Sequence, residues 1–196
     1  GWFRPGAAYV LSDYYLGACR VVEHLYALGH RRILMVNSRL NKFSAAGFRY
    51  TRHHDFNDGF LQSVREHGIS DTVQMWELSL NHENLGEEPH GEAFRELMTH
   101  PDRPTAIVSF IDSVCFSAIP VLSKLGLRVP RDVSLIGYHD TSLATAAPVA
   151  LSSVSLRPEV IARRAAALAL NGRELVCETV EPELVLRRST AKCTTI

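Results

Sequence analysis

The sequence predicts an α/β protein whose mostly parallel strands form doubly wound sheets covered by helices. Short, wholly apolar runs alternate along the chain with amphipathic stretches of helical length. A strand that is covered on both faces is apolar throughout, as in residues 33–36 (ILMV). A helix on the surface of a sheet instead repeats its apolar residues every three or four positions. Strands that alternate with helices of about 10–15 residues indicate βαβ units, and therefore a parallel sheet with helices on both faces.

The expected helices carry apolar spacing or terminal signals. In the first, Val21, Val22 and Leu25 fall at helical spacing, and Gly29 follows as a stop. In the third, acidic residues and Pro89 stand in the first turn, which suits the helix dipole and the missing N–H donor. In chain order, the helices are expected at residues 16–28, 55–67, 87–100, 113–125 and 158–170.

The other helices have their own signals. The second turns Phe56 and Phe60 inward and ends at Gly68, and the fifth opens at Pro158 and stops at Asn171 with the glycine that follows. The fourth is apolar on nearly every side. Such a helix lies deep in a core or is covered by a partner.

The strands are expected at short apolar runs between these helices. Ligands of open parallel sheets bind beyond the carboxyl ends of the strands, so the segments after Val36, Ser109 and Tyr138 are the candidate site. Residues 37–53 and the stretch after Tyr138 are expected to be loops. The expected strands are residues 33–36, 73–78, 105–110, 133–138, 152–156 and 183–187.

Composition excludes several classes of protein. Of 196 residues, 46% are hydrophobic, and 21 basic residues balance 21 acidic ones, so the chain lacks the basic surface that non-specific nucleic-acid binding requires. No run reaches the ~18 apolar residues of a membrane span, and the N-terminus lacks the order of a secretory signal. The cysteines have no CxxC spacing and are typical of buried thiols in a reducing cytosol: Cys19, Cys115, Cys177 and Cys193.

Motifs for catalysis or cofactor binding are missing. The sequence has no GxGxxG, GxxxxGK[ST], GxSxG or HExxH pattern, so we expect neither an enzyme nor a bound cofactor. His53, His54 and Asp55 form the densest cluster of metal-ligating types. Neighbouring helix residues point in different directions, so a solvated junction is favoured over a metal site.

Three polar residues follow predicted strands. His139 and Asp140 come directly after residues 133–138, and Asp112 follows residues 105–110. Each position has two interpretations. Asp140 would contact a ligand or form a turn that caps the next segment, and Asp112 would face a ligand or cap the following helix.

Several blocks resemble the effector-binding region of LacI/GalR-type bacterial transcription regulators. The most specific is LGLRVPRDVSLIGY at residues 125–138, which is similar to the family's LGLRVPEDVSVVGFDD. Other blocks keep the family order: Asp13 and Gly17 as in VDNxxGA, EHL with LGHRRI at 23–33, PDRPTAI at 101–107, LSSV at 151–154 and RST at 188–190. The resemblance therefore covers nearly the whole chain.

The resemblance implies two doubly wound subdomains of the type I periplasmic-binding-protein kind. They are joined by three crossing segments and hold an effector between them. Residues 1–38 and 153–178 correspond to part of the N-terminal subdomain, residues 39–152 and 179–190 to the C-terminal, effector-binding subdomain, and 191–196 to a tail. The apolar helix corresponds to one at family dimer interfaces, with Val114, Phe116, Ser117 and Val121 as interface residues.

The chain departs from the family in length. Family chains carry a helix-turn-helix headpiece and the first strands of the N-terminal subdomain before the point where this sequence starts. We therefore expect the strand at residues 33–36 to lack sheet neighbours and to leave an open apolar edge.

The chain also departs from the family in the pocket. Phe56 stands where sugar-binding members have Arg, and His139 replaces the first Asp of an Asp-Asp pair, of which Asp140 is kept. We expect Phe56 to stack on the ligand, Asp112 to hydrogen-bond to it and His139 to orient it. Losing the Arg and one acid removes charge-assisted bonds to hydroxyls or anions, which suits a flatter ligand or a site that has decayed.

The function implied is the effector-sensing, homodimeric part of a cytoplasmic LacI-type transcription regulator. A small molecule, a sugar or another metabolite, would modulate operator DNA binding by a headpiece outside this sequence. The alternative is a periplasmic solute-binding protein that feeds a transporter, which would need a signal peptide upstream. An enzyme on the same sheet has no nucleophile–base pair to support it.

Overall fold

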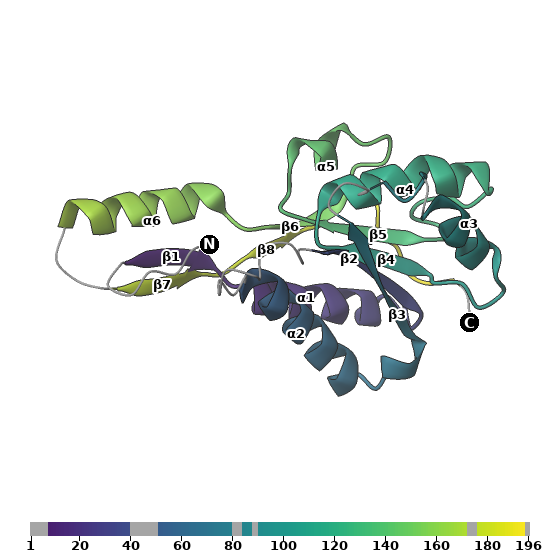
Figure 1. Ribbon diagram of the computed structural model, residues 1–196, viewed down its shortest axis with the longest axis horizontal. Helices are drawn as coiled ribbons and strands as arrows, with labels where there is room; N and C mark the ends of the chain where they lie inside the picture. The colour runs from purple at the N-terminus through teal and green to yellow at the C-terminus, as the bar shows by residue number, and fades with distance from the viewer. Residues whose placement is uncertain (1–7, 40–50, 80–83, 88–89, 172–175, 195–196) are drawn as a thin grey trace.

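The computed structural model describes residues 8–39, 51–79, 84–87, 90–171 and 176–194. A six-stranded sheet with the order β3-β2-β4-β5-β6-β8 forms the main body, and a two-stranded sheet of β1 and β7 lies apart from it. Helices α1 and α2 cover one face of the large sheet, and α3, α4 and α5 cover the other (Figure 1). The predicted α/β class with helices on both faces is confirmed.

The helices and strands have the following bounds. The helices are α1 (Tyr14–Ala27), α2 (Thr51–Glu66), α3 (Gly91–Thr99), α4 (Asp112–Lys124), α5 (Ser142–Ala146) and α6 (Pro158–Asn171). The strands are β1 (Tyr9–Ser12), β2 (Ile33–Arg39), β3 (Val73–Ser79), β4 (Ala106–Ser109), β5 (Ser134–Tyr138), β6 (Ser152–Ser155), β7 (Cys177–Val180) and β8 (Glu183–Val185).

Alternation of side chains along the strands builds a core on each face of the sheet. In β2, Ile33 and Met35 enter the cluster under α1 and α2, whereas Leu34 and Val36 enter the cluster under α3 and α4. All four are fully buried. The strands pair in parallel from β3 to β6, and only β8 is antiparallel, against β6. An inner parallel strand with both faces covered therefore explains the unbroken apolar run.

Strand order places the candidate site. The chain leaves β2 toward β3 at one end of the sheet and then returns to β4 on the other side of β2. In doubly wound sheets, ligands bind outside the carboxyl ends of the strands at the point where the order reverses. Here that point lies between the ends of β2 and β4, beside the end of β5.

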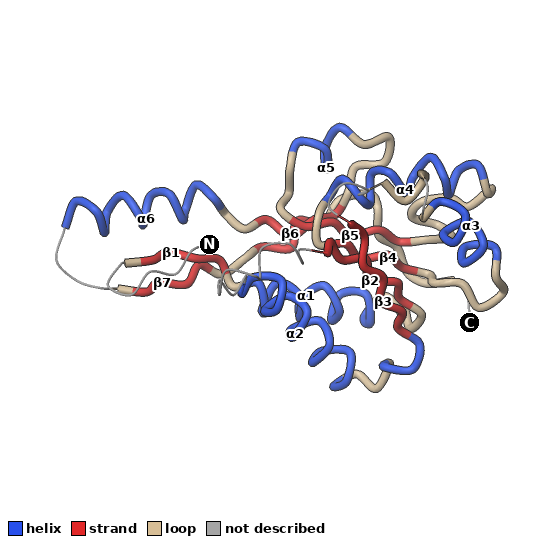
Figure 2. The backbone as a smooth tube through the Cα atoms, in the orientation of Figure 1, coloured by secondary structure: helices blue, strands red, loops and turns tan. Residues whose placement is uncertain are grey.

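A smaller unit stands beside the main body. Strand β1 pairs in parallel with β7, and α6 packs on β1 (Figures 1 and 2). The chain connects this unit to the large sheet between β1 and α1, between β6 and α6, and between β7 and β8. These are the three crossing segments that the family resemblance implied.

Two expectations about this division differ from the structure. The prediction placed residues 1–38 in the smaller unit, but β2 is an inner strand of the large sheet and α1 packs beside it. The strand at residues 33–36 was expected to have an open edge, and this is wrong, because β2 pairs with β3 on one side and β4 on the other. Segments that follow β2 in the sequence supply both neighbours.

Short elements account for most of the other differences. Strands β1 and β7 and the five-residue α5 were not predicted, and β2 extends three residues beyond Val36. Part of the expected 37–53 loop is helical from residue 51, and residues 40–50 lie outside the described part of the chain. Strands β1 and β7 have four residues each and pair with each other from distant parts of the chain. Such short segments have too little local pattern to be recognised in the sequence.

The expected tail is anchored to the main body. The Ala191 N–H donates to Ser134 Oγ (3.1 Å), and the Cys193 N–H donates to the Leu28 carbonyl (2.8 Å). His30 lies beneath, with Nε2 3.0 Å from the Ala191 carbonyl and Nδ1 2.9 Å from Thr105 Oγ1. Because a carbonyl only accepts, Nε2 carries the proton and neutral Nδ1 accepts from the threonine.

Stability is expected to fall as the pH drops below about 6.5, the ordinary pKa of histidine. Burial lowers the pKa of His30 in the folded chain, and burial lowers that of His24 as well. The unfolded chain therefore takes up protons first, so the stabilisation is complete above the unfolded pKa and is lost as pH falls toward the depressed folded pKa. Urea unfolding between pH 8 and pH 5 measures this loss.

The control for this pH dependence is the double variant His24→Gln, His30→Gln. It should be less stable than the parent at pH 8 and should lose less stability between pH 8 and pH 5. An unchanged slope in the variant would contradict the assignment to these two imidazoles.

Candidate functional site

Five aromatic rings meet at the carboxyl ends of β4 and β5. The rings of Phe110 and Tyr138 stack with centroids 5.7 Å apart, and Tyr14, from the start of α1, stacks on both at 5.9 and 5.7 Å. Phe56 from α2 meets Phe110 and Tyr138 edge to face at 5.2 and 5.0 Å. The His139 ring meets Phe110 edge to face at 5.2 Å. We call Tyr14, Phe56, Phe110, Tyr138 and His139 the aromatic cluster.

The members of the aromatic cluster differ in how deeply they are buried. Phe56 and Tyr138 are fully buried, Tyr14 and Phe110 are nearly so, and His139 is the half-buried member. The Tyr138 hydroxyl donates to the Tyr14 carbonyl (3.2 Å), and burial raises the pKa of Tyr138 well above its usual range. Tyr138 is therefore a neutral packing residue, and His139 is the least buried member of the cluster.

The turn after β5 holds His139 in an unusual backbone conformation. His139 has φ +86° and Asp140 has φ +50°, both in the left-handed region that non-glycine residues rarely adopt. The N–H groups of His139 and Asp140 donate to the Val154 carbonyl (2.9 Å) and Ser153 Oγ (3.0 Å). Left-handed residues held by surrounding bonds cluster at ligand sites.

Asp112 secures the same turn from the other side. Its Oδ2 accepts from the Thr141 N–H (2.6 Å) and hydroxyl (2.8 Å), and its Oδ1 accepts from Ser153 Oγ (2.6 Å). The carboxylate is fully buried, and Gly137 leaves it room, because a Cβ there would lie 2.1 Å from Oδ1. Asp112, the first residue of α4, therefore links this helix to the turn after β5 and to β6.

Asp140 forms an internal ion pair. Its Oδ1 lies 2.7 Å from Arg187 Nη1, without the angular geometry of a hydrogen bond, and each side chain is 19% exposed. Arg187 Nη1 also donates to the Leu151 carbonyl (2.7 Å). The pair ties the turn after β5 to the chain beyond β8.

The predicted ligand residues lie close together, but their surroundings change three of the expected roles. Phe56 has no exposed surface with which to stack on a ligand, and it supports Phe110 instead. Asp112 neither caps α4, whose N-cap is Ile111, nor has a free oxygen at the surface. Asp140 is in an ion pair and does not cap α5, whose N-cap Thr141 makes no side-chain capping bond. His139 is half-buried at the strand ends, and its expected role of orienting a ligand stays a prediction.

Three aromatic members of the site were missed. Tyr14, Phe110 and Tyr138 have no motif, and in the sequence they read as ordinary core residues beside helix and strand ends. Tyr14 lies 124 residues before Tyr138, which contacts it. The one available signal was position, because Phe110 and Tyr138 end strands whose carboxyl ends were expected to meet.

The predicted interface residues lie on α4, where the chain itself covers most of the helix. Val114 and Val121 are buried in the core shared with α3 and α5. Phe116 and Ser117 are half-buried, and Ser117 Oγ accepts from the Leu85 N–H (3.0 Å). The lack of a polar face therefore follows largely from packing within the chain.

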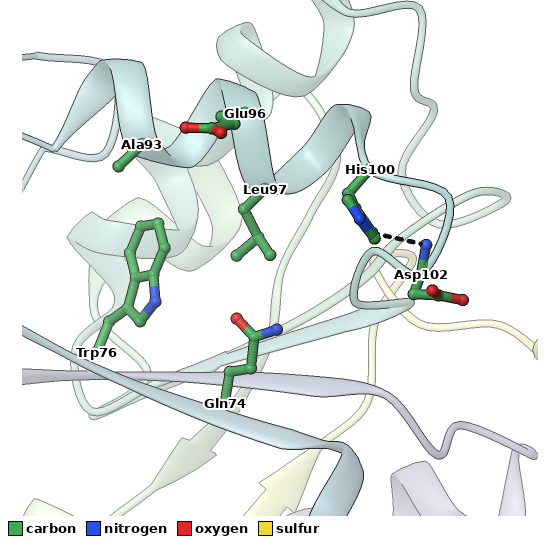
Figure 3. A pocket seen from close by; sticks show the side chains of 7 residues that line it. All are labelled: Gln74, Trp76, Ala93, Glu96, Leu97, His100 and Asp102. Carbon is green, nitrogen blue, oxygen red and sulfur yellow. Dashed lines mark hydrogen bonds between the residues drawn. The ribbon is translucent and has the colours of Figure 1, made fainter.

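Two adjoining hollows lie away from the aromatic cluster, toward the amino ends of the strands. One, of about 440 Å³, opens between β3 and α3; Gln74 and Leu97 point into it between Trp76 and His100 (Figure 3). The other, of about 410 Å³, shares Gln74 and Asp102 with it and is lined by Arg31 and Arg32. Because ligands of such sheets bind at the carboxyl ends, neither hollow is the leading site.

The described residues contain no group of three metal-ligating side chains, and the side chains of His53 and His54 fall outside the described set. None of the described helices has both the length and the apolar character needed to cross a bilayer.

Comparison with known proteins places the chain in a family. Residues 22–190 match the model of the "Periplasmic binding protein-like domain". The HTH-type transcriptional repressor PurR of Yersinia enterocolitica is 29% identical over 93% of this chain and 51% of its own length. The arabinose metabolism transcriptional repressor of Geobacillus stearothermophilus is 28% identical over 89% and 47%. The chain thus spans about half the length of these relatives.

Solved structures agree with this fold. A LacI family regulator from Rhizobium etli superposes with a TM-score of 0.79 at 26% identity, covering 96% of this chain and 66% of its own. A LacI regulator from a Rhodococcus species gives 0.76 at 27% identity, with the same coverage. A ribose-bound LacI family regulator from Enterococcus faecium gives 0.78 at 19% identity, covering 98% and 68%. The chain therefore belongs to the periplasmic binding protein-like domain family, and its resemblance to LacI/GalR-type effector-binding regions is confirmed.

Proposed function

We propose that this chain is the effector-sensing part of a LacI-type transcription regulator. A small molecule would bind at the carboxyl ends of β2, β4 and β5, between the main body and the smaller unit. The observation that carries this proposal is the turn after β5, where two consecutive left-handed residues are held by hydrogen bonds and present His139 at the strand ends. Curated relatives named as repressors and a ribose-bound neighbour of the same fold support it.

The mechanism is a shift between two arrangements of the units. A ligand that contacts both units in one arrangement and not in the other stabilises the first by its difference in affinity. In a homodimer, that change would alter the spacing of two DNA-binding headpieces on an operator. The proposed dimer uses the part of α4 where Phe116 and Ser117 keep exposed surface. We place this regulator in the cytoplasm, where operator DNA is found.

DNA binding by the complete gene product tests the proposal. Fluorescence anisotropy on DNA from beside its own gene should show saturable binding that weakens steeply with salt. The matched control is the present 196-residue chain, whose basic and acidic residues balance and which should not bind at the same salt concentration.

The runner-up, an exported solute-binding protein, gives the opposite result. Reading the codons upstream of Gly1 would then reveal a signal peptide in place of a helix-turn-helix, and the complete product would not bind DNA. That pair of results would replace the regulator with a transport protein.

A further inference from the structure

We propose that the two adjoining hollows near the amino ends of the strands form one binding site for a zwitterionic amino acid with an aromatic or large apolar side chain. The site lies away from the carboxyl ends of the strands, so it goes beyond the proposed function and does not depend on it. Three observations carry the inference. The two hollows share part of their lining, one of them presents apolar surface, and the other presents opposite charges that are not paired with each other.

Both hollows are large enough for a small metabolite. The hollow between β3 and α3 has a volume of about 440 Å³, the second has about 410 Å³, and Gln74 and Asp102 line both. Sites for small molecules typically have volumes of about 300–1,000 Å³. Two compartments that adjoin but differ in lining suit a molecule whose two ends differ in chemistry.

Trp76 and Leu97 give the hollow between β3 and α3 its apolar surface. Trp76 stands on β3, and Leu97 reaches down from α3 on the opposite side of the hollow (Figure 3). Both side chains are half-buried and pack against the core cluster under α3 and α4. The indole ring of Trp76 meets Phe94 edge to face, with centroids 6.3 Å apart, which fixes its position. A ligand ring or branched aliphatic chain placed here would remove the exposed apolar surface of both residues from water.

The second hollow is lined by two arginines, of which one is available. Arg31 is used internally, because its guanidinium carbon lies 3.6 Å from the centroid of the Tyr26 ring and its Nη1 donates to the Tyr26 and His30 carbonyls. Arg32 uses Nε, which donates to the Arg103 carbonyl (3.2 Å). Within the described part of the chain, the two Nη groups of Arg32 have no partner. They form a planar pair of donors whose geometry matches a carboxylate.

Asp71 and Asp102 bring the opposite charge to the same hollow. Asp102 lies in the turn after α3, where its N–H donates to His100 Nδ1 (3.1 Å, Figure 3), and Asp71 lies in the short turn before β3. Both side chains are exposed, and among the described residues neither carboxylate has a hydrogen-bond or ion-pair partner. Arg32 therefore lines this hollow together with two carboxylates without pairing with either of them. Charges of both signs are left for a ligand that carries both.

An amino acid matches this arrangement at each of its three groups. Its carboxylate would accept from the Nη groups of Arg32, and its ammonium group would lie beside Asp71 and Asp102. Its side chain would pass Gln74, whose amide both donates and accepts, and pack against Trp76. A molecule with one charge alone would leave either the arginine or the carboxylates facing a like charge or water. The charged groups are exposed, so salt screens them and binding should weaken as the salt concentration rises.

The test uses the complete gene product and four probes that differ by one group. L-phenylalanine has both charges and a ring, phenethylamine lacks the carboxylate, 3-phenylpropanoate lacks the amine, and glycine lacks the ring. Calorimetric titration should give saturable binding of L-phenylalanine. Each of the other three probes should bind about fivefold more weakly or worse, because each loses one of the three contacts.

Variants assign each contact to a residue. Arg32→Gln should weaken L-phenylalanine binding by about three- to fivefold and should not weaken the binding of phenethylamine, which has no carboxylate. Asp102→Asn should weaken L-phenylalanine binding and should not weaken that of 3-phenylpropanoate. Trp76→Leu should weaken binding of all three probes that have a ring. The matched control is Arg31→Gln, which should change L-phenylalanine binding by less than about twofold, because Arg31 is used internally.

Three contrary results would overturn the inference. L-phenylalanine would then not bind, or would bind no more tightly than phenethylamine and 3-phenylpropanoate. Equal losses in Arg31→Gln and Arg32→Gln would show that general charge, and not a carboxylate held by Arg32, causes the binding. A loss with His139→Asn but none with Trp76→Leu would move the amino acid to the carboxyl ends of the strands.

Discussion

Replacing Asp112 by alanine should lower the free energy of unfolding by about 3–5 kcal/mol. The side chain is fully buried and accepts from the Thr141 N–H, the Thr141 hydroxyl and Ser153 Oγ. The substitution leaves three donors without partners and opens a void beside Gly137 of β5 and Ser153 of β6. Urea unfolding followed by circular dichroism measures the loss as a lower midpoint with an unchanged slope.

Asp112→Asn is the matched control. Its carbonyl oxygen can take the place of Oδ2 and keep both bonds from Thr141. Its amide would then face Ser153 Oγ, which can accept. The expected loss is about 1 kcal/mol. Equal losses in the two variants would show that charge, and not the number of hydrogen bonds, holds the turn.

Gly59→Ala should cost about 3 kcal/mol or more. Gly59 lies where α2 crosses α1, and a Cβ there would lie 2.4 Å from the Tyr15 carbonyl oxygen and 2.9 Å from its carbonyl carbon and Cα. These are backbone atoms of a helix, so relief requires the two helices to separate. Separation would also loosen Phe56 and Phe60, which α2 packs into the core. Thermal unfolding should show the loss as a drop of several degrees.

Gly68→Ala provides the comparison for this change. Its added Cβ would meet nothing within 4 Å, but its φ is +65°, so only backbone strain is expected, at about 1 kcal/mol. If Gly59→Ala lowered stability no more than Gly68→Ala, the close approach of α1 and α2 would not be the reason for a glycine at position 59.

The regular part of the fold could be predicted because its signal is local. Strands β2, β4 and β5 are inner strands covered on both faces, and each therefore contains a short run of mostly apolar residues. Helix α1 ends just before Gly29, as its spacing indicated. By contrast, β1 and β7 are four residues each and are stabilised by each other from opposite ends of the chain. Nothing near either one in the sequence indicates the pairing.

The position of the candidate site could be predicted from the sequence, but the roles of its residues could not. His139, Asp140 and Asp112 follow the carboxyl ends of predicted strands, so they were expected to lie close together. They do lie close together in the structure. Their roles depend on partners far along the chain: Ser153 is 41 residues from Asp112, and Arg187 is 47 residues from Asp140. A carboxylate whose partners lie so far away cannot be recognised from the sequence as already occupied.

In the proposed mechanism, the three short connections between the two units would act as the pivot. They consist of Asp13, residues 156–157 and residues 181–182, so few backbone torsions are available, and Pro182 has its φ fixed. Several connections side by side would resist sliding of one unit past the other, so tilting would be the easiest relative motion of the two units. Helix α6 extends from these connections. It has 14 residues and is therefore about 21 Å long. A tilt of about 10° would carry its far end about 4 Å, so a small displacement at the strand ends becomes a large one at the tip of α6.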